Sequence, residues 1–158
     1  MGVQVKNNPN NIKNQSLIII DDNETDRYLL KRLLKKGNIN CEVFEAENGK
    51  IALDFFTNEE ENKKKHPDSY PPLLIFLDIN MPIMGGFEFL EAFNELKAKR
   101  DILKSVVFAM ITSSDRKEDI EKAKSYDFVE GFITKGSLTV EILKETILKK
   151  FPDIIFEE

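Results

Sequence analysis

The sequence is short of the residues that build disulfide frameworks, thiolate metal cages and membrane spans. Its 158 residues include one cysteine, Cys41, which permits neither an intramolecular disulfide nor a thiolate cage. That usage is typical of a reducing, cytoplasmic setting. No apolar run approaches the roughly 18 residues that a membrane helix needs. Residues 1–15 form a polar, Asn-rich extension, unlike a secretory signal. We therefore expect a cytoplasmic protein.

Basic charge and histidine are also scarce. The chain has 23 Lys and Arg against 28 Asp and Glu, a net charge of -5. Binding to a nucleic-acid backbone needs a basic face that displaces counterions, so the composition disfavours a nucleic-acid partner. The single histidine, His66, lies beside Pro67 in a polar segment. We expect it to be a solvated loop residue, and Cys41 to be a small strand residue.

Short apolar runs alternate with longer amphipathic ones along the chain. Asn23 caps a first predicted helix, Gly37 stops it, and Pro152 ends the last one. Residues 58–72 have no apolar period and hold three prolines, which predicts an exposed loop with solvated Glu and Lys runs. Buried strands are predicted at 17–20, 42–46, 73–77, 106–111 and 131–134, with five helices between and after them.

Strict strand–helix alternation predicts an α/β fold. Strands that are apolar throughout must be covered on both faces, so the expected product is a doubly wound, five-stranded parallel sheet with five helices. We expect a domain over residues 16–150, after the extension 1–15 and before a short tail, 151–158. In such folds the functional site lies at the carboxyl ends of the strands.

Carboxylates follow two of the predicted strands. Asp21 and Asp22 follow the first and Asp78 the third, while Thr112 and Lys135 follow the fourth and fifth. Carboxylates crowded at one edge repel one another, and Mg²⁺, which prefers hard oxygen ligands, would relieve that repulsion. Alternatively, Asp21 and Asp22 only cap the first helix. An aspartate beside Mg²⁺ can also act as a nucleophile that forms an aspartyl phosphate. Lys135 and Thr112 would then offset and bind the phosphoryl charge.

These residues resemble the motifs of response-regulator receiver domains. The resemblance rests on Asp21-Asp22, on Leu77-Asp78-Ile79-Asn80-Met81-Pro82 with Gly86, on Ile111-Thr112-Ser113 and on Phe132-Ile133-Thr134-Lys135. It covers about residues 16–150 and implies a flavodoxin-like strand order of 2-1-3-4-5.

The resemblance also implies a role for each motif residue. Asp78 would be the phosphoacceptor, and Asp21, Asp22, Asp78 and the backbone carbonyl of Asn80 would hold Mg²⁺. Thr112 and Lys135 would grip the phosphoryl group, and Thr112 and Phe132 would form the switch that changes protein–protein binding. A histidine kinase or a histidine phosphotransfer protein would be the phosphoryl donor. The chain would be a stand-alone signalling domain without other enzymatic activity, and its downstream partner is not specified.

One departure from the family pattern bears on geometry. The family usually has proline after the lysine, often with a cis bond, whereas this chain has Gly136. A cis bond without proline costs roughly 3 kcal/mol, so we expect Lys135–Gly136 to be trans. The apolar tail residues Ile154, Ile155 and Phe156 are expected to pack on their own domain, or alternatively to pair with a second copy in a homodimer.

Three other classes of protein are alternatives to a phosphorylated receiver. A dehalogenase-type phosphatase would carry an acid where this chain has Asn80, and its nucleophile would follow the first strand. A flavodoxin-like cofactor site would offer a phosphate-binding loop where Asp21 and Asp22 stand. The third class, a pseudo-receiver that is never phosphorylated and acts as an interaction module, stays open.

Overall fold

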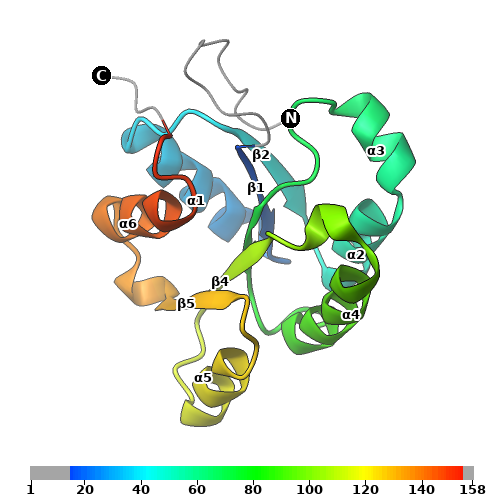
Figure 1. Cartoon of the computed structure of the whole chain (residues 1–158). Coiled ribbons are helices and arrows are strands. Elements are labelled where there is room, and N and C mark those ends of the chain that lie inside the picture. Colours follow the sequence, from blue (N-terminus) through cyan, green and yellow to red (C-terminus); the bar gives the residue numbers. More distant parts are fainter. Residues whose placement is uncertain (1–14, 155–158) are drawn as a thin grey trace.

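The computed structural model describes residues 15–154, which fold into a five-stranded parallel sheet with helices on both faces (Figure 1). The strands are β1 (Ser16–Ile20), β2 (Glu42–Ala46), β3 (Leu74–Leu77), β4 (Val107–Thr112) and β5 (Val129–Thr134). Their order is β2-β1-β3-β4-β5, as predicted. β5 begins two residues before its predicted start, and Cys41 lies just outside β2, although it is buried.

Six α-helices connect and cover the strands. They are α1 (Glu24–Lys36), α2 (Gly49–Thr57), α3 (Glu59–Lys65), α4 (Gly86–Lys99), α5 (Lys117–Lys124) and α6 (Val140–Lys150). Two short 3₁₀ turns, η1 (Asp101–Leu103) and η2 (Lys135–Ser137), precede β4 and α6. The predicted caps of α1 are confirmed, since Asn23 Oδ1 accepts a hydrogen bond from the Asp26 amide and Gly37 N–H donates to Leu33.

The predicted loop at 58–72 is wrong for its first half, because α3 forms there. Its first turn holds Glu59, Glu60 and Glu61 and its last turn Lys63, Lys64 and Lys65, so the charges complement the helix dipole. Two ion pairs at helical spacing, Lys63–Glu59 and Lys65–Glu61, support it. All seven residues of the helix are polar or charged, so it shows no apolar stripe. Its one buried side chain is that of Asn62, which donates to the Phe55 carbonyl. The prolines all follow it.

The second half of that segment is partly buried rather than solvated. The His66 ring packs edge-on against Phe44, with 4.9 Å between ring centroids, and its Nδ1 lies 4.0 Å from Glu42. The Tyr70 hydroxyl is buried and donates to the Phe56 carbonyl at 2.9 Å. The expectation of a solvated His66 is therefore wrong.

The sheet divides the core in two. On one face, α2, α4 and α5 cover a cluster centred on the phenylalanines Phe56, Phe89, Phe93, Phe108 and Phe128. On the other face, α1 and α6 cover Leu17, Ile19, Phe76 and Ile111. β1 and β3 are buried along their whole length, so residues immediately after them stand at the top of a packed, rigid layer.

The C-terminal helix is followed by two buried apolar residues. Phe151 and Ile154 pack into the cluster beneath α1 and α6, as predicted for a tail that packs on its own domain. Ile155 and Phe156 lie outside the described residues, as does the polar extension up to residue 14. Within residues 15–154, no helix is long and apolar enough to cross a bilayer.

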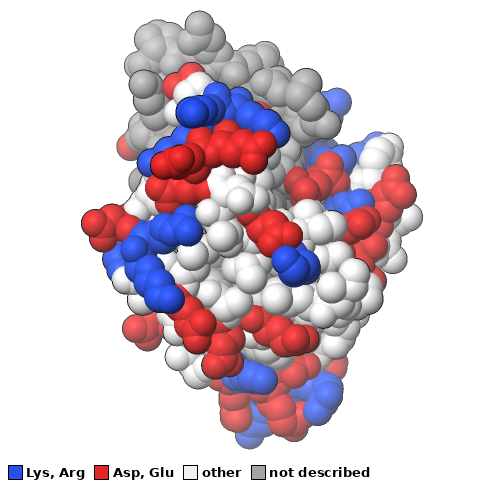
Figure 2. Space-filling view, turned by 90° about the vertical axis from the view of Figure 1, so that its right-hand side faces the viewer, with Lys and Arg blue, Asp and Glu red and all other residues white. Residues whose placement is uncertain are grey.

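Charges of both signs mix on the side of the molecule that carries α2, α3 and α4. Figure 2 shows acidic and basic side chains interspersed around a broad uncharged area on this side. The described residues of this face thus offer no continuous basic surface of the kind that a nucleic-acid backbone requires.

Candidate functional site

The polar residues expected at the strand ends meet at the carboxyl edge of the sheet. β1 ends at Ile20 and β3 at Leu77, and these two residues are paired in register. Asp21 and Asp78, the next residues, are therefore neighbours, and both are buried. Asp22 is exposed, yet its carboxylate lies close to those of Asp21 and Asp78. One oxygen from each of the three carboxylates lies within 4.8 Å of the other two.

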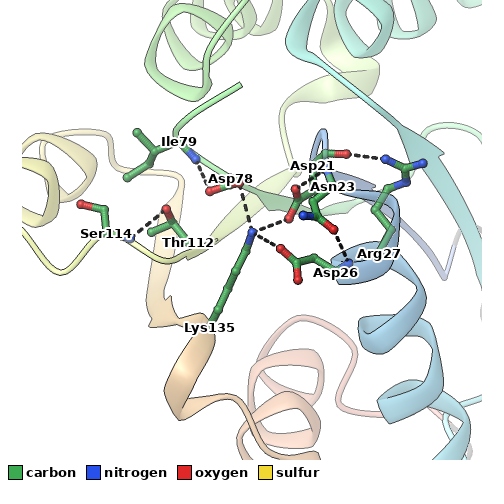
Figure 3. A network of polar contacts seen from close by, with 9 residues as sticks. All are labelled: Asp21, Asn23, Asp26, Arg27, Asp78, Ile79, Thr112, Ser114 and Lys135. Atoms are coloured by element: carbon green, nitrogen blue, oxygen red, sulfur yellow. Dashed lines mark hydrogen bonds and ion pairs between the residues drawn. The ribbon is translucent and has the colours of Figure 1, made fainter. Parts of the chain in front are cut away.

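Backbone hydrogen bonds orient the two buried carboxylates. Asp78 Oδ1 accepts from the Ile79 amide at 2.8 Å, and Asp21 Oδ1 accepts from the Asn23 amide at 2.9 Å. The remaining oxygen of each points to Lys135 (Figure 3). Burial raises the pKa of Asp21, and the nearby Lys135 ammonium lowers it only in part. Asp21 is therefore a carboxylate whose charge is costly without a cation beside it.

Lys135 joins the end of β5 to this acidic edge. Its Nζ lies 2.8 Å from Asp21 Oδ2 and 3.2 Å from Asp78 Oδ2. Partial burial would lower the pKa of Lys135, but its hydrogen bonds to carboxylates outweigh burial and raise it. The lysine is thus fully charged at neutral pH, in the position where a negative group on Asp78 would need it.

A third carboxylate on Lys135 was missed by sequence reasoning. Asp26 Oδ2 lies 2.7 Å from Lys135 Nζ, closer than either strand-end aspartate. Its sequence position suggested only a favourable acid in the first turn of α1. The available signal was its spacing: a residue in that turn, five positions after Asp21, faces back over the end of β1.

Thr112 and Phe132, the expected switch residues, differ in exposure. Thr112 is fully buried at the end of β4, and its Oγ1 accepts a hydrogen bond from the Ser114 amide at 3.3 Å. Ser114 in turn donates from its hydroxyl to Asp119, which ties the β4–α5 loop to α5. Phe132, on β5, is partly buried against the cluster of phenylalanines.

Two glycines shape the loops around the site. A side chain at Gly86 would collide with the Asp78 carbonyl and the Ile79 Cα, so only glycine lets the start of α4 approach the end of β3 this closely. The Lys135–Gly136 bond is trans, as predicted, and the cis bond among residues 15–154 is Tyr70–Pro71. Gly136 is the middle residue of the turn η2 and is exposed, and a side chain there would meet open space.

A cavity of about 860 Å³ adjoins the site on the α1 side of the sheet. Its polar end is formed by Asp21, Asp26, Asp78 and Lys135. Its apolar walls come from leucines of α1, from Phe76 and Ile111 of the sheet and from Leu138 after η2. The cluster of carboxylates around one lysine therefore stands at an accessible edge, although its individual groups are largely buried.

A family comparison decides what this arrangement is. The model of the response regulator receiver domain matches residues 17–147. The chain belongs to the receiver domains of two-component systems. Receiver domains are signalling domains rather than classical enzymes, as the resemblance implied.

Individual relatives of this receiver domain differ in length. It is 28% identical over 129 residues to response regulator Rcp1 of Synechocystis, covering 81% of both chains. It is 30% identical over 138 residues to hybrid signal transduction histidine kinase I of Dictyostelium discoideum, covering 85% of this chain but 7% of the kinase. The Mn²⁺-bound structure of Rcp1 matches with a TM-score of 0.62 and 25% identity, covering 91% of this chain and 99% of that one.

Proposed function

We propose that this receiver domain accepts a phosphoryl group on Asp78 from a phosphohistidine of a histidine kinase or a histidine phosphotransfer protein. The observation that carries the proposal is the setting of Asp78 at the end of β3. Its carboxylate is buried, lies 3.2 Å from the Lys135 ammonium, and shares one edge with Asp21 and Asp22. Charge neutralisation and positioning are what phosphoryl transfer requires of a protein.

The acidic cluster suits a divalent cation, and we propose Mg²⁺. Asp21, Asp22 and Asp78 present hard oxygen ligands within 4.8 Å of one another, and burial makes the negative charge of Asp21 costly. These three residues and the backbone carbonyl of Asn80 would hold the ion. Bound there, it would supply positive charge that offsets the negative charge of a phosphoryl group. Rcp1, a relative, has a structure in an Mn²⁺-bound form.

The residues of the chain account for the transfer itself. An oxygen of the Asp78 carboxylate attacks phosphorus, the bond from phosphorus to the donor's imidazole nitrogen breaks, and its electron pair leaves with the imidazole. The product is an acyl phosphate on Asp78. The Ile79 amide fixes one carboxylate oxygen beforehand, at 2.8 Å. Lys135 donates to the phosphoryl oxygens, and the Thr112 hydroxyl would provide a further donor.

Phosphorylation would alter the surface through Thr112 and Phe132. The Thr112 hydroxyl would be drawn to the phosphoryl group, breaking its present contact with the Ser114 amide. The partly buried ring of Phe132 would move into the released space, which changes the face formed by α5, β5 and α6. The output would be altered binding of a downstream protein, in the cytoplasm, by the receiver domain of residues 16–150.

The competing proposal is a pseudo-receiver that is never phosphorylated and acts as an interaction module. What supports phosphorylation over this alternative is that Asp21, Asp22, Asp78, Thr112 and Lys135 all stand at the same edge of the sheet. A pseudo-receiver has no need of the lysine, whose buried charge would be costly without its carboxylate partners.

Intact-mass spectrometry after incubation with acetyl phosphate tests the proposal. With Mg²⁺ present we expect one phosphoryl adduct on the wild type, no adduct after chelation with EDTA, and none on Asp78→Asn. Asp68→Asn, which changes an exposed aspartate at a distance from the site, is the matched control and should be modified like the wild type. A wild type that stays unmodified with acetyl phosphate and with a phosphohistidine donor would instead establish the pseudo-receiver.

A further inference from the structure

Lys135 has as many carboxylate partners as it has protons to donate. An ammonium carries three N–H donors and no acceptor. Its Nζ lies within hydrogen-bond distance of Asp21, Asp26 and Asp78, at 2.8, 2.7 and 3.2 Å. Lys135 can therefore donate to a new acceptor only by giving up one of these contacts.

Asp26 differs from the other two partners in its location. It lies in the first turn of α1, outside the group of carboxylates that could share a cation, and its position is fixed by the Asn23 cap. The Asp26–Lys135 ion pair joins α1 to the residue that follows β5 (Figure 3). Both residues line the polar end of the cavity described above. Both side chains are largely shielded, with 33% and 22% of their surface exposed.

We infer that Asp26 is a positioning residue that competes with a phosphoryl group on Asp78 for the ammonium of Lys135. This inference rests on the proposed function. A phosphoryl group adds acceptor oxygens beside Asp78 and draws Lys135 toward them, while Asp26 draws it toward α1. Asp26 thereby stabilises the unphosphorylated state and sets how strongly the site retains a phosphoryl group.

The inferred competition predicts that one substitution lowers the stability of the unphosphorylated protein and raises its affinity for a phosphoryl mimic. Asp26→Asn keeps the shape of the side chain but removes its charge, so the unphosphorylated protein should lose stability. The same change should strengthen binding of a phosphoryl mimic, because Lys135 is released to it. A residue with a merely structural role would not increase affinity when it is mutated.

Calorimetric titration with beryllium fluoride, in the presence of Mg²⁺, measures the predicted change in affinity for a phosphoryl mimic. We expect Asp26→Asn to bind this phosphoryl mimic about fivefold more tightly than the wild type. An affinity change of that size corresponds to the free energy of one partly exposed ion pair. Glu24→Gln removes the same charge from an exposed position in the same turn of α1. It should stay within about twofold of the wild type, because long-range effects of an exposed charge are screened.

Urea unfolding of the unliganded protein measures the predicted change in stability. In a double-mutant cycle with Lys135→Met, Asp26→Asn should lower the unfolding midpoint of the wild type. In the Lys135→Met background it should leave the midpoint unchanged or raise it, because removing Asp26 there relieves repulsion among carboxylates.

The two measurements separate the ways of failing. An absence of coupling between Asp26 and Lys135, or an affinity of Asp26→Asn for beryllium fluoride equal to or below that of the wild type, overturns the inference. If the wild type itself binds no beryllium fluoride, the proposed function fails and takes this inference with it. Coupling in urea would then still show that the ion pair exists, so the fault would lie in the function.

Discussion

At the scale of single residues, two partly buried lysines show how the type of acceptor sets the direction of a pKa shift. Lys97 Nζ donates to three backbone carbonyls, those of Leu103, Lys104 and Val106. Burial lowers the pKa of Lys97, since carbonyls carry no compensating charge. Lys135 also has three partners, but they are carboxylates and its pKa is raised. Lys97 thus ties α4 to the turn η1 and the residues after it, whereas Lys135 lies among the carboxylates of the proposed phosphorylation site.

Ile83 is the residue whose local structure fits its identity least well. It lies in the loop between β3 and α4 with φ at 71°, a left-handed conformation that β-branched side chains rarely adopt. Its side chain is 79% exposed, so little packing offsets the strain. Asn38, the other described non-glycine residue with positive φ, is of a type that tolerates this conformation.

Ile83→Asn should therefore stabilise the protein. We expect the free energy of unfolding to rise by about 1 kcal/mol, because the left-handed conformation costs a β-branched residue roughly that amount more. Urea unfolding followed by circular dichroism measures it. Ile51→Asn, which changes an exposed isoleucine in regular α2, is the control and should give no such gain. An unchanged or lower stability for Ile83→Asn would show that the loop, not the residue, determines the conformation.

At the scale of elements, Glu45 ties α1 to β2. Its carboxylate accepts from Arg27 at 3.1 Å and from Lys31 at 2.8 Å, two residues one helical turn apart on α1. Burial alone would raise the pKa of Glu45, but the two hydrogen bonds outweigh it and lower the pKa below its ordinary 4.5. A carboxyl group with a lowered pKa stabilises the fold above that ordinary value, and the stabilisation is lost as pH falls.

The effect of Glu45→Gln should consequently depend on pH. At pH 7 we expect it to lower the free energy of unfolding by about 1 kcal/mol, as for a partly exposed ion pair with two cations. Below the ordinary pKa of 4.5 the difference from the wild type should shrink, because the carboxylate becomes protonated in both states. Unfolding curves at a series of pH values measure this, and a pH-independent difference would refute the electrostatic origin.

At the scale of the whole molecule, the sequence predicted the sheet better than it predicted what surrounds it. The strands were recognisable because β3 is apolar throughout and β1 is apolar after its first residue, Ser16, as expected for strands that are buried on both faces. α3 was not, because its seven residues are all polar or charged and its stability comes from ion pairs and a single buried Asn62.

The sequence likewise predicted the strand-end residues of the candidate site better than the contact from α1. Asp21, Asp78 and Lys135 each follow a predicted strand, and the carboxyl ends of parallel strands lie at one edge of the sheet. Their positions along the chain were therefore enough to predict that they lie close together. The spacing of Asp26 after Asp21 indicates only that it faces the end of β1, whereas its contact with Lys135 also depends on how the lysine side chain reaches across from the end of β5. The trans bond before Gly136 followed from residue type alone, and it is observed.

The C-terminal residues extend the core on the α1 and α6 side. Phe151 and Ile154 are both buried there, and the Ile154 amide donates to the Phe151 carbonyl at 3.1 Å. The domain boundary predicted at residue 150 therefore divides a single packed cluster. Self-association through Ile154 would require it to leave that cluster first.

Ile154→Ala should accordingly affect folding and not assembly. We expect a loss of about 2 kcal/mol in the free energy of unfolding, at the low end for a buried isoleucine because the position is near the end of the cluster. Analytical ultracentrifugation should give the same sedimentation profile as for the wild type. A mutant of wild-type stability that sediments as a smaller species would instead support pairing of the tail with a second copy.

The placement of α3 has a consequence for how the chain can be modified. α2 carries the chain away from the carboxyl edge of the sheet, so α3 and the segment that leads into β3 lie at the opposite, amino-terminal edge (Figure 1). Every strand-end residue of the site is on the far side of a rigid, fully buried layer. Residues 63–65, exposed and held mainly by surface ion pairs, are thus an insertion point for a fluorescent reporter or an affinity tag.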